Sequence, residues 1–324
     1  MKIAVTGASG FLAGNLIPLL LEQGHVVYAI VRQKKNIHLP QHSNMMVCEG
    51  QLNDNQFISE VLKSCDAIVH IAAITRQSHL KLEDYYLVNV EQTLSLCKLS
   101  IDAGVKRFVF VSSANTRYHG NHKFQGHENE AYQMPFSGSY YAQSKYLAET
   151  ELLKLKDEIN LSIVNPTFIL GPNDQGASSG RLIKTLMKRK IWFCPPGSKN
   201  IVHVSDVCRC ISIILTQNQT GERYLLAGEN YNYHHIYKSI QKQLELNSKI
   251  RIIVLPAFVL VALGRIGNLL RKLGLENELS LVNAQILCTK VNYGNEKAKK
   301  ELGVEFANLD KTLSDAVKWH LGKH

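Results

Sequence analysis

The first half of the chain alternates short apolar runs with longer segments of helical periodicity. The runs that have the length and composition of buried strands are Lys2–Thr6, Val26–Val31, Ala67–Ile71, Arg107–Val111 and Leu161–Asn165. The intervening segments with helical periodicity are Phe11–Gln23, Asn55–Lys63, Glu83–Ala103 and Tyr140–Asp157. Apolar strands separated by helices form parallel sheets that are covered on both faces. The pattern therefore predicts an α/β fold with a doubly wound parallel sheet.

The pattern changes from about Gly171, where glycine and proline separate shorter elements. Ser205–Gln217 is expected to be a helix and Arg223–Ala227 a strand, and both should return to the main domain. Residues 233–302 are expected to be mostly helical, with a closing helix at Leu309–Leu321. We therefore predict a main domain of residues 1–170 that also takes in about 203–228. Residues 171–202 and 229–324 would form a smaller, discontinuous and mostly helical region.

Composition and charge exclude several classes of protein. The chain has 324 residues, of which 45% are hydrophobic and 20% charged, as in ordinary globular proteins. The net charge of +10 is compatible with an anionic partner, but the basic residues are scattered. The longest basic cluster, at Arg32, Lys34 and Lys35, is too short for a nucleic-acid-binding tail. We expect a small-molecule substrate and no nucleic-acid partner.

The cysteines and the apolar segments indicate where the protein works. The seven cysteines are irregularly spaced, and no C-x-x-C or H-E-x-x-H motif is present, so we expect no metal site. Reduced thiols suit the cytoplasm. The apolar segment Pro256–Leu270 falls short of the roughly 20 residues that span a bilayer, so no transmembrane segment is expected. A buried or amphipathic helix is the main interpretation of that segment, and attachment to a membrane surface is the alternative.

A glycine-containing turn joins the first strand to the first helix. Thr6–Gly14 places Gly7 and Gly10 where a tight turn and the close approach of a pyrophosphate need them, and Ala13 is the third small residue. The unpaired N–H groups at a helix N-terminus favour phosphate. The turn therefore predicts a dinucleotide site and a Rossmann fold, with a purely structural turn as the alternative. The residues expected at the dinucleotide are Gly7, Ser9, Gly10, Phe11 and Leu12.

The end of the second strand indicates which dinucleotide binds. A carboxylate there would bind the ribose hydroxyls of NAD, but the segment Ile30–Lys35 contains no acid. Arg32, helped by Lys34 or Lys35, can instead pair with the 2′-phosphate of NADP. NADP is therefore the expected cofactor and NAD the alternative.

Tyr141 and Lys145 stand four residues apart on one face of an expected helix. A free tyrosine has a pKa of about 10 and is a poor acid or base at neutral pH. An ammonium group one turn away favours the phenolate and lowers the tyrosine pKa. Ser113, just past the fourth strand, could hydrogen-bond a substrate carbonyl. This spacing is common on solvated helices, but its place downstream of a dinucleotide turn favours catalysis.

Together these motifs resemble the extended short-chain dehydrogenases/reductases, and the match covers nearly all of the chain. The resemblance implies that Ser113, Tyr141 and Lys145 are catalytic, with Ser112 as the second choice of serine. It also places Tyr141 and Lys145 against the cofactor and implies a homodimer that pairs through the helices Glu83–Ala103 and Tyr140–Asp157.

The segments that carry the resemblance are Thr6–Gly14, Asp66–Ala73, Asn89-Val90, Phe108–Ala114, Tyr141–Lys145 and His203–Val207. The further residues that the resemblance places against the cofactor are Gln51, Leu52, Ala72, Ala73, Pro166 and Phe168. Where the family often has Asp-Leu beside adenine, this chain has Gln51-Leu52.

The segment after the fifth strand indicates the branch of the family. Nucleotide-sugar epimerases tend to carry an asparagine near the position of Phe168, whereas Asn165-Pro-Thr resembles the dihydroflavonol reductase-like and 3β-hydroxysteroid dehydrogenase-like members. The run Gly176–Arg181 resembles bacterial dihydroflavonol reductase-like proteins. The residues expected near the substrate, which the smaller region would bind, are Ser113, Phe168, Arg181 and His203; Arg181 and His203 could equally be structural.

These observations predict an NADP-dependent oxidoreductase that transfers a hydride to the carbonyl of a small organic substrate, or oxidises the alcohol, with Tyr141 as the acid/base. The first alternative is a nucleotide-sugar epimerase or dehydratase that retains NAD. The second is a non-catalytic protein that senses NADP.

Overall fold

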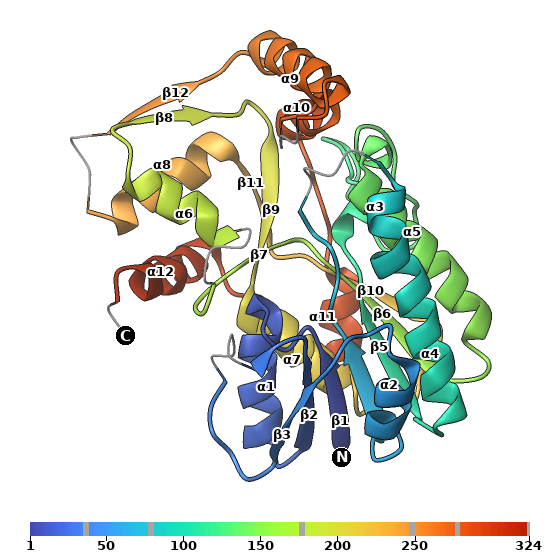
Figure 1. Ribbon diagram of the computed structural model, residues 1–324. Helices are drawn as coiled ribbons and strands as arrows, with labels where there is room; N and C mark the ends of the chain where they lie inside the picture. The colour runs from blue at the N-terminus through green and yellow to red at the C-terminus, as the bar shows by residue number, and fades with distance from the viewer. Residues whose placement is uncertain (35–38, 77–80, 175–178, 246–249, 276–278, 323–324) are drawn as a thin grey trace.

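The computed structural model describes residues 1–34, 39–76, 81–174, 179–245, 250–275 and 279–322. Its centre is a parallel sheet of seven strands in the order β10-β6-β5-β4-β1-β2-β3 (Figure 1). This sheet confirms the predicted doubly wound α/β fold. The strands are β1 (Lys2–Thr6), β2 (Val26–Val31), β3 (Met45–Glu49), β4 (Ala67–His70), β5 (Arg107–Val111), β6 (Asn160–Pro166) and β10 (Glu222–Leu226).

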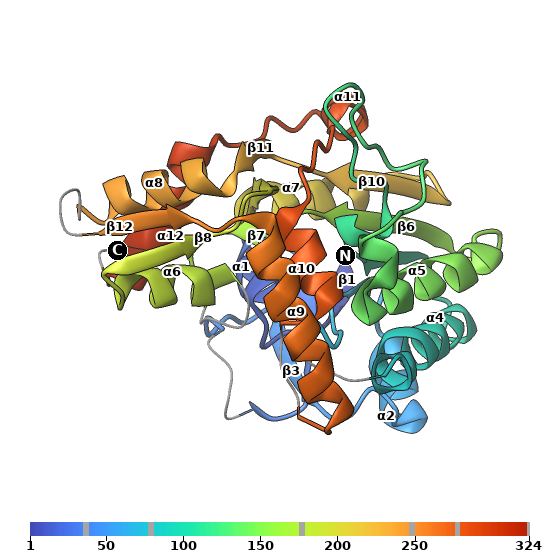
Figure 2. The ribbon, with the colours of Figure 1, turned by 90° about the horizontal axis from the view of Figure 1, so that it is seen from above.

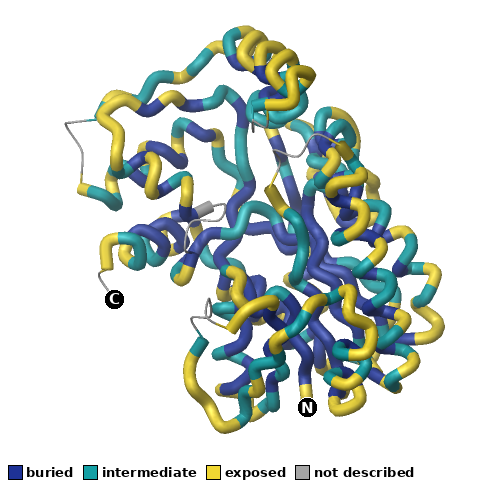
Figure 3. The backbone as a smooth tube through the Cα atoms, in the orientation of Figure 1, coloured by how far each residue is buried: buried dark blue, intermediate teal, exposed yellow. Residues whose placement is uncertain are grey.

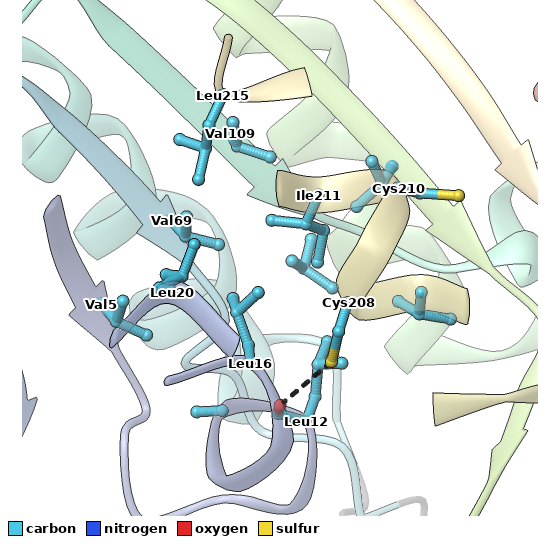
Figure 4. Close-up of a cluster of buried hydrophobic side chains, with 14 of the residues drawn as sticks. Val5, Leu12, Leu16, Leu20, Val69, Val109, Cys208, Cys210, Ile211 and Leu215 are labelled. Carbon is cyan, nitrogen blue, oxygen red and sulfur yellow. Dashed lines mark hydrogen bonds between the residues drawn. The ribbon is translucent and has the colours of Figure 1, made fainter. Parts of the chain in front are cut away.

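The inner strands of this sheet are buried on both sides because helices cover both of its faces. On one face, Leu16 and Leu20 of α1 pack with Ile211 of α7 against Val69 and Val109 of the sheet (Figure 4). Fully burying one such side chain contributes about 1.5–3 kcal/mol. A second buried cluster lies under α2, α4 and α5 on the other face. The covering helices are α1 (Phe11–Glu22), α7 (Val204–Ile214), α11 (Glu296–Leu302), α2 (Asn55–Leu62), α4 (Gln92–Asp102) and α5 (Tyr140–Leu152).

The long helix expected at Glu83–Ala103 is not uniform. It begins as α3 (Glu83–Tyr86), widens into a π-helical turn at Leu87–Glu91 and continues as α4. Such π-helical turns insert one extra residue and occur often at functional sites. The turn contains Asn89, whose side chain bonds outside the helix. The second long helix also ends earlier than expected, because α5 passes into a 3₁₀ turn at Leu153–Leu155.

The remaining elements form what we call the upper region, above the sheet in Figure 1. It contains a three-stranded sheet in the order β11-β9-β7 and a parallel pair, β8 and β12. The sequence pattern does not predict these small sheets, nor β3 of the main sheet. The elements of the upper region are β7 (Phe168–Leu170), α6 (Ser179–Met187), β8 (Ile191–Cys194), β9 (Ser198–His203), β11 (Glu229–Asn232), α8 (Tyr233–Gln243), β12 (Arg251–Val254), α9 (Ala257–Lys272), α10 (Leu281–Cys288) and α12 (Leu309–His320).

The upper region has its own buried cluster, centred on Trp192 between α6 and α8. The indole Nε1 of Trp192 donates to the carbonyl of Leu186 at 2.8 Å, which satisfies its polar atom in the interior. The return of α7 and β10 to the main sheet is visible in the view from above (Figure 2). We retain, as a proposal, the division of the chain near residues 170, 203 and 228, except that α11 packs on the main sheet, where Ala298 and Leu302 join its buried cluster. Among the described helices, none combines the length and the apolar composition needed to cross a bilayer.

Candidate active site

The glycine turn after β1 packs closely against the loop that follows β4. Gly7 has a φ of +67°, and a methyl group added to it would lie 2.9 Å from the backbone nitrogen of Ala72. Only glycine fits such a position without strain. The turn closes when the N–H of Gly10 donates to the carbonyl of Gly7 at 2.9 Å. Gly7, Ala72 and Ala73 therefore lie at one edge of the sheet, as predicted.

The N-terminus of α1 begins directly at this turn. Gly10 is its N-cap, and no described side chain caps the helix. The first N–H groups of Phe11 and Leu12 thus have no intrahelical acceptor, and Ser9 is exposed beside them. A helix start with free N–H groups after a glycine cradle fits a pyrophosphate. The residues present therefore fit the dinucleotide that the sequence predicts.

A buried histidine supports the turn from behind. His70 Nδ1 lies 2.7 Å from Thr6 Oγ1, and His70 Nε2 lies 2.9 Å from Thr93 Oγ1. Thr6 Oγ1 also accepts bonds from the N–H groups of Ile71 and Ala72 at 3.1 and 3.2 Å. Burial lowers the pKa of His70 to about 3, so the ring is neutral at physiological pH. This chain of bonds fixes the loop after β4 against the turn.

Asn89 connects the same loop to the helix that carries Tyr141. Its Oδ1 accepts from Ile74 N at 2.8 Å, and its Nδ2 donates to Ile74 O and to Ser144 Oγ, both at 3.0 Å. Asn89 is buried in the π-helical turn. The sequence alone predicts no individual role for Asn89. The signal that could have indicated one is a polar residue on an otherwise apolar helix face.

The structure brings Ser113, Tyr141 and Lys145 together beside this loop. Ser113 follows β5, and its side chain lies near enough to that of Tyr141, the second residue of α5, to act on the pKa of the phenol. Lys145 lies one helical turn later and is buried. Its Nζ donates to the carbonyl of Val111 at 2.8 Å and lies 4.5 Å from the ring centroid of Phe110. The three groups therefore occupy the carboxyl ends of neighbouring strands, where parallel sheets bind ligands.

The pKa shifts at these groups differ from the sequence expectation in one respect. Burial raises the pKa of Tyr141, and the hydrogen bond from Ser113 opposes that shift. We expected the ammonium of Lys145 to lower the tyrosine pKa. Burial lowers the pKa of Lys145 itself to about 7, and its proton points to Val111 O. A lysine that is only partly charged at neutral pH exerts less effect on the phenol.

A buried carboxylate lies one turn beyond Lys145. Glu149 is fully buried and accepts bonds from Ser112, from Thr116 at 2.7 Å and from Asn165 at 2.7 Å. Arg117, also buried, donates to its second oxygen at 2.6 Å. The cluster holds β5, α5 and β6 in one arrangement. Because the hydroxyl of Ser112 is committed to Glu149, Ser113 is the better placed of the two serines.

The residues expected around the adenosine lie at the ends of β2 and β3. Arg32 is exposed directly after β2, and Gln51 is exposed after β3. Leu52 is half-buried against the cluster under α2. This is where an adenine and its ribose would extend from the turn. Lys35 lies outside the described residues.

Pro166 ends β6 and Phe168 begins β7, so both stand at the boundary between the main sheet and the upper region. Lys199 Nζ lies 5.1 Å from the ring centroid of Phe168. Burial lowers the pKa of Lys199 to about 8. Sequence reasoning missed Lys199, because only the pairing of β7 with β9 brings it to Phe168. A desolvated cation beside the expected substrate position can bind an anionic group.

The two remaining substrate candidates are placed differently. Arg181 is exposed on α6, which packs against β7. His203 is buried and caps α7, since its Nδ1 accepts from Ser205 N at 3.1 Å. Its Nε2 lies 3.3 Å from Asp315 Oδ2. The cap made by Nδ1 supports the structural alternative, while the buried Nε2 approaches Asp315 without making a hydrogen bond.

Comparison with known proteins agrees with this geometry. The model of the NAD-dependent epimerase/dehydratase family matches residues 3–232. A Synechocystis sp. protein that carries the name of a dihydroflavonol 4-reductase is 27% identical, over 97% of this chain and 93% of its own. Sterol demethylase protein B of Methylococcus capsulatus is 26% identical over 98% of both chains.

The fold also matches solved structures. The structure of UDP-glucuronic acid 4-epimerase from Bacillus cereus, in complex with UDP-glucuronic acid and NAD, has a TM-score of 0.79. It is 19% identical and covers 100% of both chains. Relatives of this chain include reductases and dehydrogenases. The protein therefore belongs to the NAD-dependent epimerase/dehydratase family, and it is an enzyme of the extended short-chain dehydrogenase/reductase type.

Proposed function

We propose that the enzyme is an NADP-dependent oxidoreductase that reduces the carbonyl of a small organic substrate. The observation that carries this proposal is the grouping of three residues at the carboxyl end of β5: Ser113 follows the strand and acts on Tyr141, and Lys145, one turn further along α5, donates to the carbonyl of the last residue of the strand. The same edge of the sheet holds the glycine turn. A phenol and a hydroxyl placed together there can bind one carbonyl oxygen from two directions.

The roles of the three residues follow from their chemistry. Bound NADPH supplies the hydride. Ser113 donates a hydrogen bond that polarises the carbonyl oxygen, and Tyr141 gives its proton to that oxygen as negative charge develops. Lys145 holds the ribose hydroxyls of the nicotinamide half and, in its charged form, favours the phenolate. Since burial lowers its pKa to about 7, its charge is sensitive to any anion or dipole that enters the site.

Replacement of Tyr141 by phenylalanine tests the proposal. The ring and its packing remain, but the proton donor is lost, so kcat should fall by about 10²–10⁴ while the Kd for NADPH stays within about twofold. The assay is NADPH oxidation with a panel of ketones and aldehydes. Tyr140→Phe is the matched control, because Tyr140 is the neighbouring residue of α5 and is exposed. Full turnover by Tyr141→Phe would contradict the assignment, and tight NADPH binding without any wild-type turnover would favour the sensing alternative.

The choice of NADP rests on Arg32. An exposed guanidinium at the end of β2, in a segment with no acid, suits a 2′-phosphate. Arg32→Asp should lower the ratio of kcat/KM for NADPH to that for NADH at least tenfold. Arg251→Asp, an exposed arginine on β12, should leave the ratio unchanged. An unchanged ratio in Arg32→Asp would shift the assignment to NAD.

One observation favours the epimerase alternative. Lys199 supplies a half-buried cation beside Phe168, where an anionic substrate group would gain most. A nucleotide diphosphate or a substrate carboxylate would both satisfy it. Thermal-shift measurements with UDP-, GDP- and dTDP-sugars, together with extraction of bound NAD, separate the candidates. Stabilisation by a nucleotide sugar that Lys199→Met abolishes would support the epimerase.

We also infer the setting in which the enzyme works. All seven cysteines are free in the structure. That thiol content supports a reducing compartment such as the cytoplasm. A homodimer through the α4 and α5 surface is the assembly that the family resemblance implies.

A further inference from the structure

Helix α9 presents an apolar face that no described residue covers. Phe258 is 74% exposed, Leu273 70%, Leu269 59% and Ile266 54%. With Ala262 between them, these residues recur every three or four positions. At about 100° per residue they fall within an arc of roughly 80° on the outer side of the helix. The inner side of α9, which carries Leu260, Gly264 and Gly267, is buried.

The strands that precede α9 extend this face. In β8, Trp192 and Cys194 point into the upper region, while Ile191 and Phe193 are 48% and 54% exposed. Alternate side chains of a strand lie on opposite faces, so Ile191 and Phe193 point outward together. In the paired strand β12, Ile253 stands opposite Phe193 and therefore belongs to the same face. Figures 1 and 2 place β8, β12 and α9 at the same end of the molecule, and Figure 3 shows the exposed outer side of α9 there. We call Ile191, Phe193 and the outer side of α9 the apolar surface.

The charged residues within β8, β12 and α9, all of which are described, are basic. Among the described residues 250–275 there is no Asp or Glu, whereas Arg265 and Lys272 are exposed on α9. At about 100° per residue both lie along one border of the apolar arc. Three further exposed cations, residues 188–190, lead directly into β8, and the exposed Arg251 begins β12. The surface thus combines protruding apolar side chains with a basic border.

This combination selects an anionic bilayer as the occupant. Helices that lie in a membrane interface bury an apolar face about 5–10 Å deep and carry basic residues beside it. Basic residues near an anionic membrane surface strengthen this attachment. A second copy of the chain fits less well, because a two-fold contact would bring the basic borders together, and like charges in an interface are unfavourable.

The apolar surface also lies close to the active site. Helix α9 packs on α10, and α10 packs on the turn that precedes α5. A methyl group added to Gly138 in that turn would lie 3.0 Å from Val282 Cγ2 of α10. Tyr141 is three residues further along the chain. Only the α9–α10 pair therefore separates the apolar surface from the segment that carries the proposed proton donor.

We propose that α9, together with the outer faces of β8 and β12, docks the enzyme on the surface of an anionic lipid bilayer without crossing it. Docked in this way, the enzyme faces the membrane with the outer side of α9, and α10 lies between α9 and the turn that precedes α5. The docking itself does not depend on the proposed reaction.

Flotation of the full-length protein with vesicles tests the proposal. Vesicles of phosphatidylcholine and phosphatidylglycerol at 1:1 should bind the protein at least tenfold more strongly than vesicles of phosphatidylcholine alone. The triple variant F258S/L269S/L273S should lose at least tenfold in binding to the mixed vesicles. The variant R265Q/K272Q should lose at least fivefold, and only with the anionic vesicles. Phe124→Ser is the control, because Phe124 is 67% exposed elsewhere on the molecule and should leave binding within twofold of wild type.

A second measurement locates the contact. Tryptophan at position 258, introduced by Phe258→Trp, should be quenched by brominated phosphatidylcholine in the mixed vesicles, whereas tryptophan introduced by Phe124→Trp should not. Circular dichroism and thermal melting of every variant separate loss of docking from loss of folding. Wild-type protein that floats with neither vesicle, or a triple variant that binds like wild type, would overturn the proposal. A concentration-dependent dimer that the triple variant abolishes would also overturn it, because the face would then be an interface between copies.

Discussion

The main sheet and the upper region differ in two ways: polar side chains are buried in pairs around the sheet, and large apolar side chains are exposed on the surface of the upper region. Around the sheet, polar side chains are buried but paired: Glu149 with Arg117, and His70 with Thr6 and Thr93. In the upper region, large apolar side chains such as Phe258 and Phe193 are exposed. Burying a paired polar group has a desolvation cost, but the pair fixes the geometry of the surrounding segments. An exposed large apolar side chain does not contribute to the stability of the fold.

This difference indicates which property constrains the sequence in each region. Around the sheet, the polar pairs hold the glycine turn, the loop after β4 and the start of α5 in fixed positions. In the upper region, the apolar surface serves something outside the fold. Variants that alter paired polar groups should therefore damage stability, and variants on the apolar surface should not.

The largest expected effect is at Glu149. Glu149→Gln removes the charge that compensates the buried Arg117 guanidinium, and breaking a buried pair costs about 3–5 kcal/mol. Urea unfolding measures the loss. Glu151→Gln is the control, because Glu151 pairs with Lys154 on an exposed helix face, where such pairs contribute about 0–1 kcal/mol. Equal losses of stability in the two variants would show that the buried pair contributes no more to the free energy of unfolding than the exposed pair.

The next effect separates two glycines with similar backbone geometry. Gly7 and Gly24 have φ of +67° and +77°, but only Gly7 has neighbours within contact distance of an added methyl group. Gly24→Ala should cost about 1–2 kcal/mol from backbone strain. Gly7→Ala should cost about 2–4 kcal/mol, because overpacking against Ala72 adds to the strain. Gly7→Ala should also weaken NADPH binding at least tenfold, measured by fluorescence titration, while Gly24→Ala leaves it unchanged.

A smaller effect appears only in acid. Folding lowers the pKa of His70 from 6.5 to about 3, so between these values the unfolded chain binds more protons than the native protein. The native protein is therefore fully favoured above pH 6.5 and loses stability as the pH falls toward 3. At pH 5 this loss is about 2 kcal/mol.

The variant His70→Gln carries no titratable group, so its stability should change about 2 kcal/mol less between pH 7 and pH 5 than that of wild type. Urea unfolding at the two pH values gives the comparison. The exposed His42 supplies the control, since His42→Gln should keep the wild-type pH dependence. A wild-type slope in His70→Gln would mean that another group controls the acid limb.

The main sheet was largely predictable because its signals are local. Apolar runs, the turn at Gly7 and Gly10, and the four-residue spacing of Tyr141 and Lys145 can each be recognised in one stretch of sequence. Chain order then places them at one sheet edge, since parallel strands share their direction. The strand β3 was missed because Met45–Glu49 does not form a fully apolar run. The roles of the individual site residues remain predictions.

The upper region was less predictable because its pairings join distant segments. β8 and β12 pair across about sixty residues of sequence, with Ile253 opposite Phe193, and neither strand is long enough to stand out. The contact of Lys199 with Phe168 depends on β9 lying beside β7. Likewise, the approach of Asp315 to the ring of His203 depends on the position of α12 in the fold. Such contacts are properties of the assembled fold.

The smallest expected effect is at Leu269 of α9, and its contrast with Leu260 tests the comparison on a single helix. Leu260 of α9 is buried and Leu269 is exposed. Leu260→Ala should cost about 2–5 kcal/mol, because it opens a cavity against α10. Leu269→Ser should change the free energy of unfolding by no more than about 0.5 kcal/mol, or stabilise the protein in water. Thermal melting of both variants measures the contrast. If Leu269→Ser lost as much stability as Leu260→Ala, the Leu269 side chain would pack within the fold. The exposed apolar face of the upper region would then contribute to folding, and the contrast with the main sheet would fail.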